Sequence, residues 1–128
     1  MKRTMLLFMV MAALVSTVPA YAHHSFAATY NEDETQKVEG DLVEFLFRNP
    51  HSFVQLDGPD SKGVMQRWVV EWAAGAALNR QGVTRDTLRT GDHVIVVGKP
   101  GRVVEDHRLR LQSMERPSDG WKWSGTFE

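Results

Sequence analysis

Five short segments with the composition of β-strands follow one another along this chain, separated by turn-forming residues. Their order most constrains the fold, because an alanine-rich stretch of helical composition, residues 73–81, falls between the third segment and the fourth. The expected strands are residues 36–47, 52–56, 66–72, 93–98 and 108–114. This is the order of an OB-type Greek-key barrel, so we predict a mainly all-β, five-stranded OB-like barrel with one short helix between strands three and four. Another small barrel or roll could hold the same elements.

The first expected strand carries a change of pattern. Its apolar positions move from even to odd numbers within residues 36–47, and such a switch of face indicates a β-bulge or a sharp coil. Gly40 is well suited to allow it. Further along, Gly82 stands where a helix commonly ends, which supports a helix over residues 73–81.

The third expected strand alternates cleanly. Trp68, Val70 and Trp72 share one face, which predicts that they pack in the core, with a ligand-stacking platform as the alternative. Glu71 falls on the other face. We expect it to be a solvated carboxylate, and the alternative is that it lines a pocket.

The first 22 residues are typical of a secretory signal. Lys2 and Arg3 precede an almost unbroken apolar run, Pro19 ends that run, and Ala20-x-Ala22 supplies the small residues of a cleavage site. The run is shorter than the roughly 20 residues that a membrane-spanning helix needs. We therefore expect cleavage after Ala22, with an uncleaved membrane anchor as the alternative.

Cleavage there would leave a single domain of 106 residues in the periplasm or outside the cell, with no membrane span. We expect a signal at residues 1–22, an N-terminal arm at 23–35, the OB-like domain at 36–116 and a C-terminal tail at 117–128. The arm could equally be a mobile, solvated segment.

Charge and cysteine content exclude several kinds of function. Removing Lys2 and Arg3 from the 15 basic residues leaves 13 against 16 acidic ones, so the processed chain is mildly acidic. Nucleic-acid binding requires clustered Lys and Arg, and we expect no nucleic-acid partner. The chain has no cysteine, which excludes disulfides, thiol nucleophiles and thiolate metal sites.

The junction after the signal is where the sequence offers chemistry. Cleavage after Ala22 would give His23 a free α-amine, and that amine together with its imidazole can chelate a metal ion. His24 adds a second imidazole. Nitrogen donors of this kind favour Cu(II) or Ni(II) over Mg²⁺ or Ca²⁺, so copper(II) is the expected cofactor if there is one.

A third ligand has to come from the folded domain. His51 is the best candidate, because it lies in the loop between the first two strands and follows Pro50. His107, before the fifth strand, is the second candidate, whereas His93 at the start of the fourth strand is expected to be an ordinary surface residue. The predicted metal ligands are therefore His23, His24 and His51. The alternative is a solvated tail with incidental metal affinity.

No catalytic motif is present. The serines lie in no nucleophile-elbow context, and the sequence contains no phosphate-binding glycine loop and no HExxH motif. We therefore expect a binding protein and not an enzyme. The alternative to copper binding is an envelope module that binds a protein or a small ligand on the barrel, through tryptophans such as Trp121 and Trp123.

Several motifs together resemble a family of small exported bacterial proteins classed as a domain of unknown function. They are His23-His24-Ser25-Phe26, Asn49-Pro50-His51-Ser52, Trp68-x-x-Glu71, Leu78-x-x-x-Gly82 and Leu88-x-x-Gly91-Asp92-x-Val94. The resemblance implies an exported OB-like domain of uncharacterised activity, without established catalytic residues. It also places the three candidate ligands in one recurring pattern, which favours a joint role for them.

Overall fold

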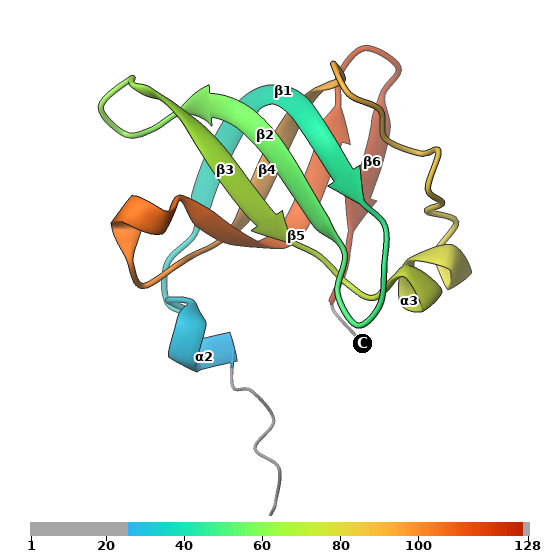
Figure 1. Ribbon diagram of the computed structural model, residues 1–128, viewed down its shortest axis with the longest axis horizontal. Coiled ribbons are helices and arrows are strands. Elements are labelled where there is room, and N and C mark those ends of the chain that lie inside the picture. Colours follow the sequence, from blue (N-terminus) through green and yellow to red (C-terminus); the bar gives the residue numbers. More distant parts are fainter. Residues whose placement is uncertain (1–25, 127–128) are drawn as a thin grey trace, which may run out of the picture.

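The computed structural model describes residues 26–126, and these form a closed β-barrel (Figure 1). The strands are β1 (Gln36–Leu46), β2 (Phe53–Pro59), β3 (Met65–Glu71), β4 (His93–Pro100), β5 (Arg108–Arg116) and β6 (Trp121–Ser124). They form one sheet in the order β3-β2-β1-β4-β5-β6, and a parallel pairing of β3 with β5 closes the barrel. The predicted five-stranded barrel is therefore confirmed, and β6 extends it beside β5.

The first strand serves two neighbours. Its first half pairs with β4 and its second half with β2, and the β2 register shifts between Leu42 and Glu44. The expected bulge is thus present, just after the position of Gly40. Gly40 itself has another role, because a Cβ atom there would overlap the carbonyl oxygen of Asp57 on β2. The absence of a side chain lets the two strands approach closely.

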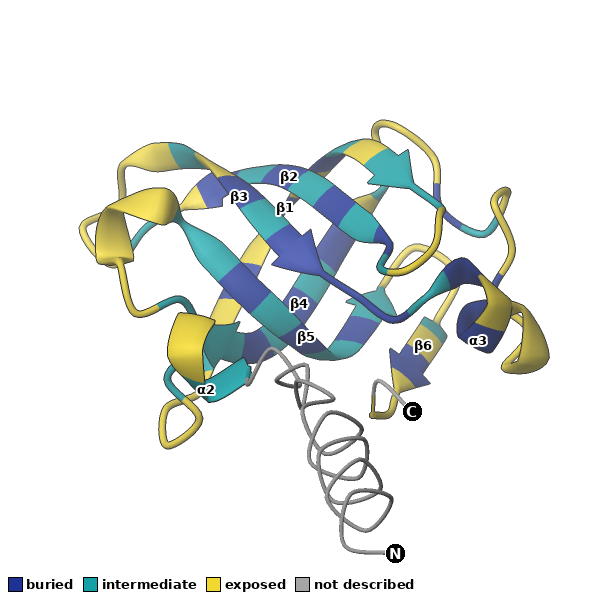
Figure 2. Cartoon of the chain, turned by 60° about the horizontal axis from the view of Figure 1, so that its bottom comes forward, coloured by how far each residue is buried: buried dark blue, intermediate teal, exposed yellow. Residues whose placement is uncertain are grey.

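Buried and more exposed residues alternate along much of the strands, as the colours of Figure 2 show. Trp68, Val70 and Trp72 are all buried, with exposed fractions of 3%, 0% and 0%. The prediction that they pack in the core is therefore confirmed. Each large apolar side chain buried in this way contributes about 1.5–3 kcal/mol relative to exposure.

One short helix, α3 (Gly75–Arg80), lies between β3 and β4 at one end of the barrel (Figure 1). Leu78 of this helix is fully buried. Gly82 has a φ of 81°, the left-handed conformation that commonly ends helices. The predicted helix and its terminal glycine are confirmed. None of the helices within residues 26–126 combines the length and the apolar run that crossing a bilayer requires.

The segment after β5, expected as a tail, contains β6 and a hydrogen-bonded turn. Trp123 is 7% exposed, and its indole N–H donates to Gln81 Oε1 at 2.8 Å, which ties β6 to the end of α3. Trp121 is partly buried beside Trp72, with ring centroids 6.5 Å apart. These two tryptophans therefore cover one end of the barrel.

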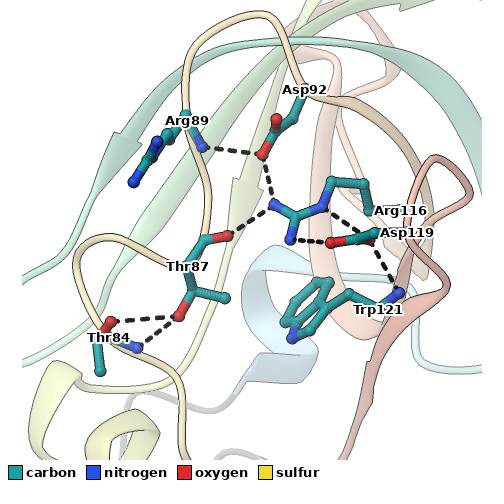
Figure 3. A network of polar contacts seen from close by, with 7 residues as sticks. All are labelled: Thr84, Thr87, Arg89, Asp92, Arg116, Asp119 and Trp121. Carbon is teal, nitrogen blue, oxygen red and sulfur yellow. Dashed lines mark hydrogen bonds and ion pairs between the residues drawn. The ribbon is translucent and has the colours of Figure 1, made fainter.

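Arg116, near the end of β5, joins three segments at that end (Figure 3). Its guanidinium donates to the Thr87 carbonyl at 2.7 Å, to Asp92 at 2.6 Å and to both carboxylate oxygens of Asp119. Hydrogen bonds to Asp119 and Asp92 raise the pKa of Arg116 above its ordinary value, so it stays charged. The network fixes the loop before β4 to the β5–β6 hairpin.

Candidate functional site

Of the three predicted metal ligands, only His51 belongs to the described residues; His23 and His24 lie outside them. His51 lies in the loop between β1 and β2, and its Nδ1 is 2.6 Å from Oε1 of Glu71, the last residue of β3. The His51 side chain is 38% exposed, whereas that of Glu71 is 10% exposed. The His51 side chain is therefore partly accessible to solvent and also contacts a buried carboxyl group.

The residues around His51 hold this loop in place. Asn49 Oδ1 accepts a hydrogen bond from the N–H of Ala76 in α3, and the peptide bond from Asn49 to Pro50 is cis. The buried Ser52 donates its hydroxyl to the Arg48 carbonyl at 3.1 Å, and its backbone bonds to the chain just after β3. The segment Asn49–Pro50–His51–Ser52 thus fixes His51 over Glu71.

Glu71 is buried, so the expectation of a solvated carboxylate is wrong. Glu71 as a whole residue is 8% exposed, and the Tyr30 hydroxyl donates a hydrogen bond to its Oε2. Arg108 Nη2 lies 3.9 Å from the same oxygen. Burial of this carboxyl group is tolerated because hydrogen-bond donors and a guanidinium surround it.

Tyr30 is almost fully buried, at 1% exposed. Burial, together with the hydrogen bond to Glu71 and its negative charge, raises the pKa of Tyr30 well above its ordinary value. The phenol therefore remains a hydrogen-bond donor across the physiological pH range. Tyr30 links the N-terminal arm to the end of β3.

The described part of the arm is packed on the barrel and is not a solvated tail. It starts with α2 (Phe26–Thr29), and Tyr30 forms an isolated β-bridge with Gly101. The connection from β4 to β5 holds it there, since Arg102 donates to the carbonyls of Ala27 and Thr29 at 2.6 and 2.9 Å. Figure 2 shows α2 beside the end of β4.

Phe26 brings this arm to the candidate ligand. Its ring stacks on the His51 imidazole, with centroids 5.8 Å apart and planes inclined by 26°. The Arg110 guanidinium lies 4.5 Å from the Phe26 centroid, and its Nη1 is 3.2 Å from Oε1 of Glu32. Two motifs that are 25 residues apart in the sequence, at Phe26 and His51, therefore meet at one place.

The contact with Glu71 defines the chemistry of His51. An ionised carboxylate only accepts hydrogen bonds, so Nδ1 would carry the proton at this contact, and in a neutral His51 imidazole the lone pair would be on Nε2. Histidines that bind metals commonly donate their second N–H to a carboxylate in this way. The arrangement suits His51 as a metal ligand through Nε2.

The other two described histidines lie elsewhere. His107 precedes β5, and its ring packs edge-on against Trp68, 5.1 Å between centroids. On the outside of the barrel, His93 Nδ1 lies 2.7 Å from Asp41 Oδ1, and its Nε2 lies 3.0 Å from Glu39 Oε1. Hydrogen bonds to Glu39 and then to Asp41 raise the pKa of His93 above its ordinary value. Within residues 26–126 no group of three or more His, Cys, Asp or Glu side chains is arranged to hold a metal ion.

Sequence reasoning missed Tyr30 and Arg108 as members of this site. Tyr30 is the one aromatic residue between Phe26 and the first strand, which is a weak signal for a buried anchor. Arg108 begins β5, where the parallel pairing of Val69 with Arg108 brings it beside β3. That pairing depends on barrel closure, and no local pattern reveals it.

Comparison with the curated proteins and with the solved structures returns no match. Residues 11–110 match a family model described as a family of unknown function, DUF6152. The match covers most of the chain, including every element from α2 to the first residues of β5. The chain therefore belongs to the DUF6152 family.

Proposed function

We propose that this protein is an exported, periplasmic or secreted binding module in which the N-terminal arm and His51 together hold one copper(II) ion. The stacking of Phe26 on His51 carries the proposal, because it brings the start of the described arm to the imidazole. His24 precedes Phe26 by two residues, and two extended residues span about 7 Å. The reach of the chain therefore permits His23 and His24 to join His51 around one ion.

The donor set would consist of nitrogen atoms. His23 would supply its α-amine and its imidazole, His24 an imidazole or its backbone nitrogen, and His51 its Nε2. Cu(II) prefers such donors in a square-planar arrangement. The α-amine has an ordinary pKa of about 7.7–8.0, so a metal ion displaces its proton at little cost near neutral pH.

Glu71 would act from behind His51. Its hydrogen bond to Nδ1 orients the ring and increases the electron density on Nε2, and partners of this kind strengthen metal binding. The surrounding charges also balance, since Glu71 and Glu32 offset the two nearby arginines, Arg108 and Arg110. The charged side chains around the site therefore sum to zero before a cation binds.

In this proposal the histidines are ligands, and none of them transfers protons or electrons to a substrate. We propose a binding function and no enzymatic one. The alternative is an envelope module that binds a protein or a small ligand without metal. Trp72 and Trp123 lie in the core, so such a partner would contact other residues of the barrel.

The proposal is tested with a chain that begins at His23 and with the free peptide His-His-Ser-Phe. Copper(II) affinity is measured for both by competition with a chelator of known affinity. We expect the folded chain to bind one ion at least about tenfold more tightly, because it adds a positioned third ligand. Equal affinities would contradict the folded site. Intact mass of the exported protein checks separately that His23 becomes the first residue.

A further inference from the structure

A second candidate site is a cavity of about 400 Å³ that Arg108 lines and that neither His51 nor Glu71 lines. The arm after α2, the β2–β3 hairpin, Trp68 and the β4–β5 connection surround it. The hairpin and the connection lie side by side at one end of the barrel in both Figure 1 and Figure 2. The cavity thus shares Arg108 with the surroundings of Glu71, but His51 does not line it.

One part of its wall is apolar. Trp68 and Pro100 line it, and Val103 and Val104 stand at its edge with exposed fractions of 54% and 76%. Among the described residues, the other two large hydrophobic side chains that are exposed, Val64 and Met65, lie on the neighbouring hairpin. Exposed apolar side chains that gather at one place commonly mark a binding surface.

Another part of the wall is cationic. It contains Lys62, Arg102 and Arg108. Among the described residues, the Lys62 ammonium has no ion-pair partner. A ligand with acceptor oxygens would accept hydrogen bonds from it.

The carboxylates of the wall are largely occupied by the protein. Asp60 accepts hydrogen bonds from the backbone N–H groups of Lys62 and Val64 and from Gln66, at 2.8, 3.0 and 3.2 Å. Glu34 accepts one from Asn31 at 2.6 Å. Glu105 is the remaining acidic residue at the cavity. Asp60 and Glu34 are therefore held by donors of the protein itself, whereas the Lys62 ammonium has no ion-pair partner among the described residues.

His107 adds a strained backbone at this place. Its φ of 46° and ψ of 51° are left-handed, a conformation that non-glycine residues rarely adopt. The conformation lets its carbonyl accept the Val69 N–H at 3.0 Å while its ring packs against Trp68 and lines the cavity. Strain of this kind clusters at functional sites.

From these observations we infer that the cavity binds a small amphiphilic carboxylate. The carboxylate group contacts Lys62 and Arg102, and the apolar part lies against Trp68, Val103 and Val104. Ligand pockets commonly combine an apolar wall with a few charged groups that fix the orientation of the ligand. The inference does not depend on copper and can fail or hold independently of the proposed copper site.

Hexanoate tests the inference, with hexanol and acetate as probes that lack either the charge or the apolar part. Each is titrated into the ¹⁵N-labelled chain that begins at His23, in buffer with a metal chelator. The Trp68 indole N–H and the backbone N–H groups of Lys62 and Val104 are followed by NMR. We expect saturable shifts with hexanoate, and affinities at least about tenfold lower for the other two probes.

Two variants locate the site. Lys62→Met removes the ammonium group but retains a side chain of similar length, and it should weaken hexanoate binding about tenfold. Lys122→Met on β6 makes the same change outside the cavity and should leave hexanoate binding unchanged. Hexanoate that gives no saturable shift around the cavity would overturn the inference. Hexanol that binds as tightly as hexanoate, or equal effects of the two variants, would also overturn it.

Discussion

Phe26 stacks on His51, with ring centroids 5.8 Å apart, so the N-terminal arm meets the β1–β2 loop at one point on the barrel. The contact rests on the buried pair behind it, since Glu71 accepts hydrogen bonds from both His51 and Tyr30. The arm, the loop and the end of β3 therefore form one structural unit. A substitution that breaks the contacts of one of these three segments should therefore alter the positions of the other two.

Glu71 should be a positioning residue for His51. In Glu71→Gln the carboxylate charge is lost while the side-chain shape is kept, and we expect copper(II) affinity to fall about 10–100-fold. Competition titration of the chain that begins at His23 measures this. Glu39→Gln, which removes a carboxylate beside His93 instead, serves as the matched control and should leave copper affinity unchanged. Equal losses in both variants would argue against a role of Glu71 through His51.

Tyr30 should titrate only at unusually high pH. Its pKa is raised in the folded chain, so the stability it contributes is complete below pH 10 and is lost as pH rises further. A chain that begins at His23 contains Tyr30 as its one tyrosine, and phenolate absorbance at 295 nm therefore reports on this residue alone. At pH 10.5 we expect almost no phenolate in the folded chain and about three-quarters of the full phenolate signal in 6 M guanidinium. Phenolate formation with an ordinary midpoint near pH 10 before unfolding would contradict the buried contact.

Arg116 should be important for stability. Lysine cannot reproduce its forked hydrogen bonds to Asp119 and Asp92, so we expect Arg116→Lys to reduce the free energy of unfolding by about 1–3 kcal/mol. Urea denaturation measures the change. Lys122→Gln removes an exposed ion pair with Glu115 and should cost less than about 1 kcal/mol. A cost of Arg116→Lys no larger than that of Lys122→Gln would show that the network contributes little.

His93 should make a small, pH-dependent contribution. Its pKa is raised in the folded state, so its stabilisation is fully present below about pH 6.5 and is lost as pH rises through the higher folded pKa. The melting temperatures of the wild type and His93→Gln should therefore differ more at pH 5.5 than at pH 8.5. Because the pair is exposed, we expect a difference of only a few degrees. A larger difference at pH 8.5 would reverse the predicted sign.

The barrel was predictable because each strand carries its own signal. Alternation in residues 66–72 placed Trp68, Val70 and Trp72 correctly, and Gly82 marked the end of the helix. The four-residue strand β6 was not predicted, since Trp121 and Trp123 are too few to establish a period. Its position depends on hydrogen bonds to β5 that form only in the folded chain.

The site was predictable only in part. His51 was predicted as a ligand because it lies in the loop between the first two strands and follows Pro50. Glu71 was expected in solvent, because it lies on the strand face opposite to Trp68, Val70 and Trp72. Its burial arises from Tyr30, 41 residues earlier, and from the parallel pairing of β3 with β5. Contacts over such separations follow from chain topology and not from any local pattern.

Copper(II) affinity of the chain that begins at His23, compared among the wild type, His51→Ala and His93→Ala, tests the central proposal most directly. We predict that His51→Ala binds copper at least about tenfold more weakly, while His93→Ala binds it as the wild type does. Circular dichroism and thermal unfolding should first establish that both variants fold. A folded His51→Ala variant with wild-type affinity would contradict the proposed site.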